Sequence, residues 1–308
     1  MTISHLGIKK LSNIPNIKIL LLKAALKRSR YDLNTFSEIS LPRNKFHYDG
    51  FELHQSAYNL YHQVVNWEVE TGILHPCYLH SLAFPLHIKL LLLPDFPFPL
   101  LGLVHVDNQI KQLRPIKHGE TLAATSYFGA LELHSKGWLF SIIVEFYSGS
   151  ELVWKSVSTN LFRFKHGHAV DPIGKHSSAN WNNPINTTWQ LTASLGRQYA
   201  KVSGDFNPIH LSKWTAKLFG FKQPIIHGMW TKSYCISGLQ KTNPKLFSQA
   251  FEFNTTFKKP LYLPNLVNMV VQPLETNSAD DKLHFQVVGV DSNNELQPLH
   301  LIGNIRVI

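Results

Sequence analysis

An aspartate and a histidine in the second half of the chain have the types and spacing needed for proton transfer. Asp205 and His210 lie five positions apart. Gly204 and the Asn207-Pro208 pair impose a tight turn on this stretch, because the residue before a proline is kept out of the helical region. A carboxylate and an imidazole held across such a turn can converge on one water molecule. Both groups act as general acids or bases near neutral pH.

A glycine at the start of a predicted helix could complete this arrangement. In the segment Pro224 to Met229, an apolar pair follows the proline, and His227-Gly228 then begins the predicted helix. Backbone N–H groups in the first turn of a helix lack intrahelical acceptors, and the helix dipole favours negative charge there. The Gly228 amide can therefore serve as an oxyanion donor. Taken alone, Asp-x-x-x-x-His is explained more simply by a helix cap and an ordinary core or surface histidine, so the wider sequence must decide.

The composition is that of a globular protein. The chain has 308 residues, of which 44% are hydrophobic and 16% charged, so disordered, collagen-like and coiled-coil classes are excluded. Its length suits one large domain or two of roughly 150 residues each. Cys77 and Cys235 are too few and too far apart for a disulfide scaffold, and no compact Cys/His zinc pattern occurs. No apolar run approaches the roughly 20 residues that span a bilayer, and we expect a soluble, cytoplasmic protein.

The positive charge is concentrated at the N-terminus. The net charge is +10, and residues 1–31 contain several bases but no acid. Leucines at 20–22 and 26 recur there at roughly helical spacing, which predicts a basic amphipathic helix. Such a helix could lie on a membrane or act as a transit peptide, but we favour a helix packed on the domain with a solvated basic face. No motif indicates nucleic-acid binding.

The hydrophobic pattern of the first half predicts helices followed by strands. A helical pattern covers Tyr48 to Glu70, and a buried helix is expected over Tyr78 to Leu93, with Pro85 kinking it or marking its first turn. Alternating, β-branched and aromatic stretches then predict strands. These strands cover Leu103–Leu113, Glu120–Leu133, Leu139–Tyr147 and Leu152–Phe164.

The second half repeats this plan after a polar linker at 166–186. A strand is expected at Thr187–Ala193, a short helix within Asn207–Phe219 and a buried helix at Gly228–Leu239. Four further strands are predicted at Ala250–Phe257, Leu266–Pro273, Lys282–Val290 and Leu299–Val307. Two halves with the same order indicate a duplicated α+β domain.

The string Ser203-Gly-Asp-Phe-Asn-Pro-Ile-His210 resembles the hydratase 2 motif of the MaoC-like, R-specific enoyl-CoA hydratases. Tyr199 supplies the motif's aromatic position and Ala216 its small residue, and the segment Pro224 to Met229 follows at the family's usual distance. The first half is similar to the amino-terminal portion of two-repeat bacterial acyl dehydratases in the same superfamily. The matching segments are Ile73–Pro76, Ala83–His87, Phe96–His105, Gln112–Ile116 and Glu151–Trp154.

The resemblance implies a double hotdog fold, in which each repeat wraps an antiparallel sheet around a long helix. We expect a basic N-terminal helical segment at 1–40, an N-terminal repeat at 41–165, the linker, and a catalytic repeat at 187–308. The first repeat has no Asp-x-Asn-Pro-x-His string, as in relatives whose first repeat makes room for a larger acyl chain. Phe84, Leu90–Leu93, Phe96 and Phe98 offer apolar surface for this, although core packing explains them equally well.

The resemblance also implies a hydro-lyase that adds water in syn fashion to trans-2-enoyl-CoA, giving (R)-3-hydroxyacyl-CoA in fatty acid metabolism. Asp205 and His210 would hold and deprotonate the water and return a proton to C2, while the Gly228 N–H would bind the thioester oxygen. No metal or redox cofactor is expected. The other candidate substrate-binding residues are Ser203, Gly204, Asn207, Pro224, Ile225 and His227.

Several of these secondary roles have alternatives. Asn207 fits a turn-shaping role better than a substrate contact, and His227 would position the Gly228 amide. Single-domain relatives carry an active-site serine eight residues beyond the glycine, where this chain has Ile236, with Ser233 and Ser237 nearby. That contact is therefore in doubt here.

The carrier of the acyl group stays open between coenzyme A and acyl carrier protein, since a basic protein attracts either. Phosphate contacts could come from four lysines around the motif, Lys201, Lys213, Lys217 and Lys222, although a solvated helix face explains them slightly better. The alternatives are a 3-hydroxyacyl-[acyl-carrier-protein] dehydratase and, in a different class, a non-catalytic acyl-thioester-binding subunit. Either a monomer or a homodimer is expected, and peripheral membrane contact is the less favoured option.

Overall fold

The computed structural model describes residues 7–27, 39–68, 72–100, 102–164, 181, 184–272, 282–290 and 296–308. Its α-helices are α1 (Ile17–Leu26), α2 (Gln55–Val65), α3 (Tyr78–Leu91), α4 (Leu195–Ser203), α5 (Lys213–Lys217) and α6 (Gly228–Thr242), with short 3-10 helices η3 (Pro208–His210) and η4 (Pro244–Ser248). The strands of the first half are β1 (Ile8–Lys10), β2 (Lys45–Glu52), β3 (Leu103–Gln112), β4 (Thr121–His134), β5 (Gly137–Ser148) and β6 (Glu151–Arg163). Those of the second half are β7 (Ile185–Leu191), β8 (Phe251–Phe257), β9 (Asn265–Val271), β10 (Leu283–Val290) and β11 (Leu296–Val307).

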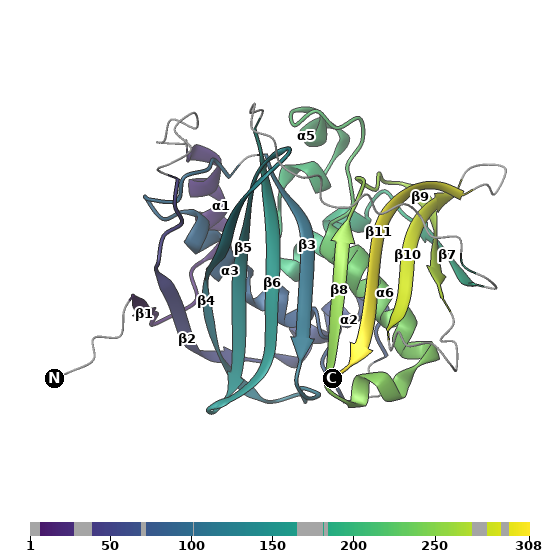
Figure 1. Cartoon of the computed structure of the whole chain (residues 1–308), viewed down its shortest axis with the longest axis horizontal. Coiled ribbons are helices and arrows are strands. Elements are labelled where there is room, and N and C mark those ends of the chain that lie inside the picture. The colour runs from purple at the N-terminus through teal and green to yellow at the C-terminus, as the bar shows by residue number, and fades with distance from the viewer. Residues whose placement is uncertain are drawn as a thin grey trace.

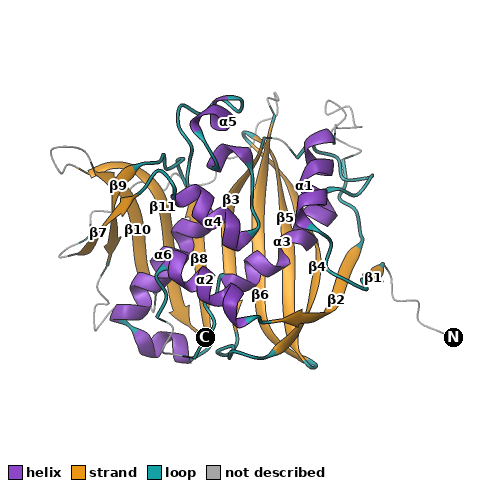
Figure 2. Ribbon diagram, turned by 180° about the vertical axis from the view of Figure 1, so that it is seen from behind, coloured by secondary structure: helices purple, strands orange, loops and turns teal. Residues whose placement is uncertain are grey.

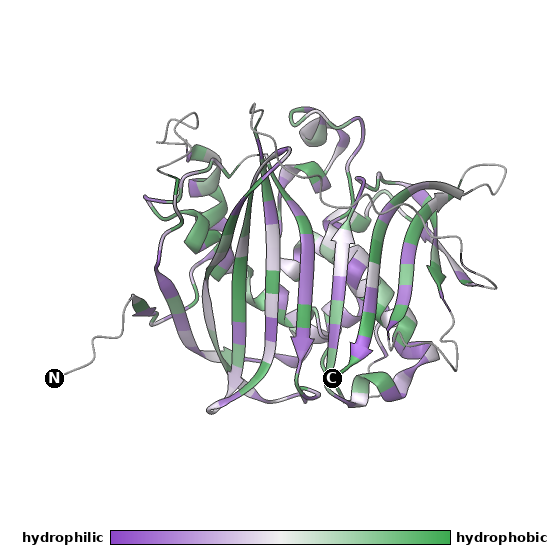
Figure 3. Cartoon of the chain, in the orientation of Figure 1, coloured by the Kyte–Doolittle hydropathy of each residue, from purple (hydrophilic) through white to green (hydrophobic). Residues whose placement is uncertain are grey.

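All strands of the described part join one sheet, in the order β1-β2-β4-β5-β6-β3-β8-β11-β10-β9-β7 (Figure 1). The helices gather on one face of that sheet, as the view from behind shows (Figure 2). Hydrophobic and hydrophilic residues alternate along the strands (Figure 3). This is the pattern of a sheet with one face on the core and one toward solvent.

The predicted duplication is confirmed. In each half a long helix, α3 or α6, precedes an antiparallel meander. The two meanders meet where β3 pairs antiparallel with β8, from Asp107↔Thr256 to Gln112↔Phe251. Because edge strands would otherwise expose unpaired backbone groups, this pairing closes two open edges at once.

A buried cation ties α6 to that junction. Lys232 is fully buried, and its ammonium donates to the carbonyl and Oδ1 of Asn108 on β3, at 2.7 and 2.6 Å, and to the carbonyl of Phe253 on β8 at 3.2 Å. All three N–H groups of the Lys232 ammonium thus have an oxygen acceptor, as a buried ammonium requires. Burial lowers the pKa of Lys232 to about 8. The contact fixes α6 against both repeats.

The N-terminal segment packs on the first repeat. Leu20 and Ala24 of α1 are buried. Lys27, just after the helix, donates to the carbonyls of Leu91 and Leu93 at 2.7 and 2.8 Å. These carbonyls lie at the C-terminal end of α3, where a cation complements the helix dipole. The favoured interpretation, a helix packed on the domain, is therefore the observed one.

Three predictions of secondary structure need correction. The stretch Tyr48–Glu52 belongs to strand β2 rather than to a helix, because Phe46 and Phe51 bury their rings while the strand pairs with β4. The N-terminal segment is not wholly helical, since Ile8–Lys10 forms β1 and pairs in parallel with β2. Helix α4 was not predicted, and the proposed linker lies almost entirely outside the described residues.

No helix among the described residues is both long and apolar enough to cross a membrane. Pro85 lies inside α3 without ending it, because the helix continues to Leu91.

Candidate active site

Helix α4 delivers the candidate base to the site. The helix ends at Ser203, and Gly204 takes the left-handed conformation with φ of 76°, which reverses the chain and which glycine adopts without steric cost. The Ser203 hydroxyl donates to the carbonyl of Tyr199 at 2.8 Å and accepts the Asp205 N–H at 3.3 Å. Ser203 and Gly204 therefore fix the position of the Asp205 backbone and have a structural role.

The turn after Asp205 is held by side chains of the motif itself. The Asn207 N–H donates to Oδ1 of Asp205 at 3.2 Å, and Oδ1 of Asn207 accepts from the Ile209 N–H at 3.4 Å. Asn207 is thereby the N-cap of η3, and Pro208 stands at its first position, where the missing N–H is not needed. The geometry supports the turn-shaping role of Asn207.

His210 is held with one ring nitrogen free for chemistry. Its Nδ1 lies 2.8 Å from the carbonyl oxygen of Ile225. A carbonyl only accepts, so the proton of the neutral ring sits on Nδ1 and Nε2 carries the lone pair. The ring is 8% exposed, and its burial lowers the pKa of His210, which the nearby Asp205 partly offsets. The histidine is therefore a neutral base.

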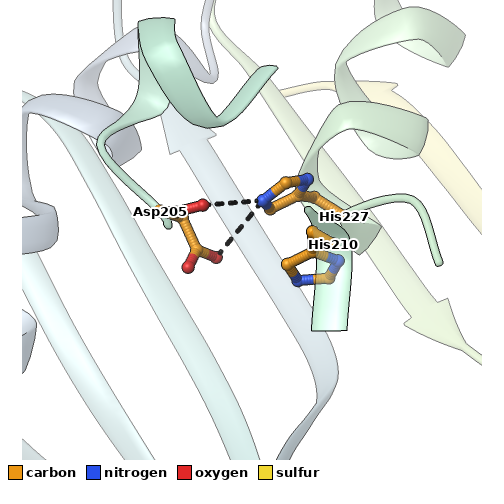
Figure 4. A group of neighbouring side chains, drawn as sticks. All are labelled: Asp205, His210 and His227. Carbon is orange, nitrogen blue, oxygen red and sulfur yellow. Dashed lines mark hydrogen bonds and ion pairs between the residues drawn. The ribbon is translucent and has the colours of Figure 1, made fainter. Parts of the chain in front are cut away.

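His227 joins the two catalytic candidates (Figure 4). Its Nε2 donates to the backbone carbonyl of Asp205 at 2.9 Å and lies 3.9 Å from Oδ2 of the same residue. Its ring stacks on that of His210 with centroids 3.6 Å apart. Burial and the neighbouring His210 hold the pKa of His227 well below its usual range, so this stack consists of two neutral rings.

Asp205 is the partly open member of the group. Its side chain keeps 29% of its surface exposed. Desolvation nevertheless raises its pKa, against the influence of His210 and the Asn207 N–H. A carboxylate with a raised pKa is a stronger base than an ordinary aspartate.

Gly228 begins α6 directly after His227, its N-cap. The preceding segment is held by the connection between β8 and β9: the Ile226 N–H donates to the carbonyl of Leu261 at 2.8 Å, and the carbonyl of Pro224 accepts from the Leu263 N–H at 2.8 Å. A β-carbon at Gly228 would lie 2.9 Å from the Phe257 ring. The absence of a side chain at Gly228 thus lets the helix begin in contact with the Phe257 ring. The N–H of Gly228 belongs to the first helical turn and has no acceptor within the helix.

Asp205, His210 and His227 each bring a potential metal-ligand atom within 4.8 Å of the others. Nε2 of His227 donates its proton to the Asp205 carbonyl, so this nitrogen offers a metal no lone pair. His210 keeps the lone pair of Nε2, because its proton is on Nδ1. The same set serves proton transfer without rearrangement.

The first repeat has a matching site that cannot work the same way. Leu74 donates to the carbonyl of Ile116 at 2.9 Å as Ile226 does to that of Leu261, so His75-Pro76 stands where the second repeat has His227-Gly228. Proline has no N–H and cannot be an oxyanion donor.

The carboxylate is missing from that site as well. Helix α2 ends at a left-handed residue, Asn66, as α4 ends at Gly204, and the next residue is Trp67 instead of an aspartate. The Trp67 indole fills the space, packing on His75 with centroids 4.7 Å apart and donating to the carbonyl of Ile73 at 3.0 Å. The first repeat therefore holds a packed indole at the position where the second repeat holds Asp205.

A cleft of about 560 Å³ runs from the first repeat to the catalytic turn. Its walls include Tyr78, Leu82 and Pro85 of α3 and, from the second repeat, Ser203 and Gly204, the two residues directly before Asp205. Phe96 and Phe98, two apolar candidates from the sequence, are instead fully buried and pack on Phe140, so they belong to the core. Ser233 is also engaged, donating to the carbonyl of Met229 at 2.6 Å.

Two contributors escaped the sequence analysis. The stacking of His227 on His210 joins residues that are far apart in the chain, and no spacing rule signals it. Gly196 on α4 is the second: its missing side chain lets the backbone of His210 pass close by, since a β-carbon there would lie 2.3 Å from the His210 carbonyl oxygen. The sequence alone does not show that a glycine in the first turn of a helix is needed for a close backbone contact, because that contact is with a distant residue.

We expect Gly196→Ala to displace His210 and lower kcat/KM roughly 10²-fold, the size of effect that a misplacement of about 1 Å produces. Gly238→Ala is the matched control, because its β-carbon would meet only the flexible Met269 sulfur at 3.4 Å. Steady-state kinetics with circular dichroism of both variants would test this. Full activity of folded Gly196→Ala would show that the close approach does not matter.

The chain is similar to known proteins of one family. Residues 178–295 match the family model of the MaoC-like domain. The chain is 30% identical over 194 residues to 3-hydroxyacyl-thioester dehydratase X of Mycobacterium tuberculosis, covering 63% of this chain and 68% of that protein. It is 25% identical over 162 residues to the peroxisomal enoyl-CoA hydratase 2 of Arabidopsis thaliana, covering 48% of this chain and 52% of the plant enzyme.

Solved structures bear out the fold. The crystal structure of HtdX of Mycobacterium tuberculosis superposes with a TM-score of 0.70 at 24% identity, covering 86% of this chain and 100% of that one. A conserved hypothetical protein of the same organism, described as having a double hotdog fold, gives a TM-score of 0.61 at 12% identity over 88% of this chain and 97% of its own. The predicted double hotdog architecture is thus confirmed, and the chain belongs to the MaoC-like dehydratase family.

Proposed function

We propose that this protein is a hydro-lyase that reversibly hydrates trans-2-enoyl-CoA to (R)-3-hydroxyacyl-CoA in fatty acid metabolism. One observation carries the proposal: the carboxylate of Asp205 and the neutral ring of His210 share a partly open site at the N-terminus of α6. The names of the bacterial and plant relatives, a 3-hydroxyacyl-thioester dehydratase and an enoyl-CoA hydratase, support the same reaction class.

In the hydration direction, Asp205 and His210 each accept a hydrogen bond from one water molecule. As the water oxygen bonds to C3 of the enoyl thioester, its proton passes to the acid-base pair and the thioester carbonyl gains enolate character. The Gly228 N–H stabilises that oxygen. The pair then returns a proton to C2 on the same face, so the net change is addition of one water, with no redox step and no metal required.

His227 acts as a positioning residue in this scheme. It donates to the backbone of Asp205 and stacks on His210, so it sets the orientation of both groups and stands next to the Gly228 amide. The cleft along α3 offers the acyl chain a route into the first repeat, since Ser203 and Gly204 of the catalytic turn form part of its walls. Both cysteines are buried free thiols, which accords with a reducing compartment such as the cytoplasm.

The test is hydration of short and medium-chain trans-2-enoyl-CoA by the whole chain, followed by loss of the enoyl ultraviolet band and chiral analysis of the product. Formation of the (R)-3-hydroxyacyl thioester is expected, and formation of the (S)-product would contradict the proposal. A strong preference for enoyl carrier protein over enoyl-CoA would favour the carrier-protein dehydratase. Tight acyl-thioester binding with no turnover on either carrier would favour a non-catalytic binding subunit.

A further inference from the structure

Helix α1 presents an apolar stripe to solvent on the face opposite its packing contacts. Ile19, Leu22 and Leu26 are 55%, 66% and 74% exposed. They recur at i, i+3 and i+7, which places them along one side of a helix. Lys18 and Lys23 flank the stripe and are exposed. Folding of the described residues therefore leaves large side chains of α1 uncovered between two cations.

Helix α5 carries a second set of the same kind. Trp214 is 78% and Leu218 82% exposed, and together they are the two most exposed large hydrophobic side chains among the described residues. The Lys217 ammonium lies 5.6 Å from the centre of the Trp214 ring, and Lys213 is exposed beside it. An exposed tryptophan with neighbouring lysines is the composition of a membrane-interface anchor.

Both helices lie at the same end of the molecule, the upper end in Figure 1 and Figure 2. The cleft links α1 to the catalytic turn, because its walls include Ile17 at the start of α1 and Gly204 of that turn. His210 is separated from α5 by only two residues of chain. The exposed side chains of α1 and α5, here called the α1-α5 face, thus border the approach to the active site.

The two chain segments that carry this face contain bases but no acids. Residues 1–31 contain no acid, and no Asp or Glu occurs between Phe206 and Phe251. A surface of this kind is attracted to anionic partners over the range of the Debye length, roughly 10 Å at moderate salt.

We propose that the α1-α5 face docks on an anionic phospholipid bilayer, with the apolar side chains inserted at headgroup depth and the lysines among the lipid phosphates. A bilayer fits better than a protein because the apolar groups project singly from two separate helices. Protein hot spots, in contrast, fill pockets within one continuous patch. Insertion removes this apolar surface from water, and the lysines add attraction to anionic lipid. The approach to the active site then lies beside the lipid surface.

The test measures co-sedimentation of the whole chain with sucrose-loaded vesicles of pure phosphatidylcholine and of phosphatidylcholine with one part in three phosphatidylglycerol. We expect binding to the anionic vesicles that weakens as salt rises. Trp214→Ala with Leu218→Ser, and separately Leu22→Ser with Leu26→Ser, should each lower the partition coefficient roughly tenfold or more. Leu60→Ser is the matched control, because Leu60 is 55% exposed on α2, away from this face.

Vesicle binding does not depend on turnover, so its result is independent of whether the protein catalyses the proposed reaction. Absence of binding to anionic vesicles, or binding that the α1-α5 substitutions leave unchanged, would overturn the proposal. Binding to an acidic carrier protein instead of vesicles, lost in the same variants, would overturn it in favour of a protein partner. A dimer in sedimentation experiments that dissociates in those variants would assign the face to a second copy of the chain.

Discussion

Asp205→Asn is expected to lower kcat/KM for enoyl-CoA hydration by roughly 10²- to 10⁴-fold, the contribution of a positioned general base. The asparagine keeps the shape of the side chain, and its Oδ1 can still accept the Asn207 N–H that shapes the turn. What is lost is the negative charge and the capacity to accept a proton. Initial rates of ultraviolet loss at subsaturating substrate measure the effect directly.

The pH profile separates loss of the base from loss of structure. Hydration needs Asp205 ionised and His210 neutral. Burial lowers the pKa of His210 from its ordinary value of 6.5, so protonation of this ring should reduce the wild-type rate at a lower pH than it would for an exposed histidine. Desolvation raises the pKa of Asp205, so protonation of this carboxylate also contributes to the acid limb in the wild type. Asp205 acts in the opposite direction by stabilising protonated His210. In Asp205→Asn the pKa of His210 therefore drops further, and the acid limb of the residual activity should move to lower pH.

Asp107→Asn is the matched control for this substitution. Asp107 also has a pKa raised by desolvation, but it lies on β3 and accepts from the Thr256 hydroxyl at 2.9 Å, outside the catalytic group. We expect its kcat/KM to stay within a few-fold of wild type. Loss of activity in both variants would point to a general effect of buried charge, and unchanged activity in Asp205→Asn would remove that residue from the acid-base pair.

The catalytic turn was predictable because its determinants are local. Gly204, Asn207 and Pro208 bias the backbone through their own φ preferences and side-chain caps, and the structure uses each in that way. The same holds for α6, whose apolar residues follow a helix start at Gly228. Turns and helix starts that depend on interactions between neighbouring residues can be predicted from sequence. Here they contain all three residues proposed for catalysis, Asp205, His210 and Gly228.

The remaining features depend on contacts between distant segments. Strand β2 was mistaken for helix because its aromatic residues satisfy either period, and only pairing with β4 selects the strand. Helix α4 contains a glycine and a polar face, so its helical signal is weak until it docks beside α2. The role of Trp67 in closing the first repeat needs the superposition of two repeats whose sequences differ at that position.

Gly228→Pro is expected to lower kcat roughly 10²- to 10³-fold, the loss reported by removing one oxyanion donor. Proline suits this place in the backbone, because the first helical position needs no N–H and has φ near that of the pyrrolidine ring. The substitution gives the second repeat the residue that the first repeat carries in His75-Pro76. Single-turnover hydration at saturating substrate would measure the chemical step.

Gly228→Ala supplies the comparison that isolates the N–H. Both substitutions add a β-carbon, which would lie 2.9 Å from the Phe257 ring, so both force the same aromatic side chain to shift. Only the proline removes the donor. The ratio of kcat between the alanine and proline variants therefore measures the loss of the N–H together with the effect of the proline Cγ and Cδ atoms, with the shared effect of the β-carbon removed. Equal rates in the two variants would exclude the Gly228 amide as a donor and assign the whole loss to displacement of Phe257. A large ratio would explain why a repeat with proline at this position can retain the fold without the chemistry.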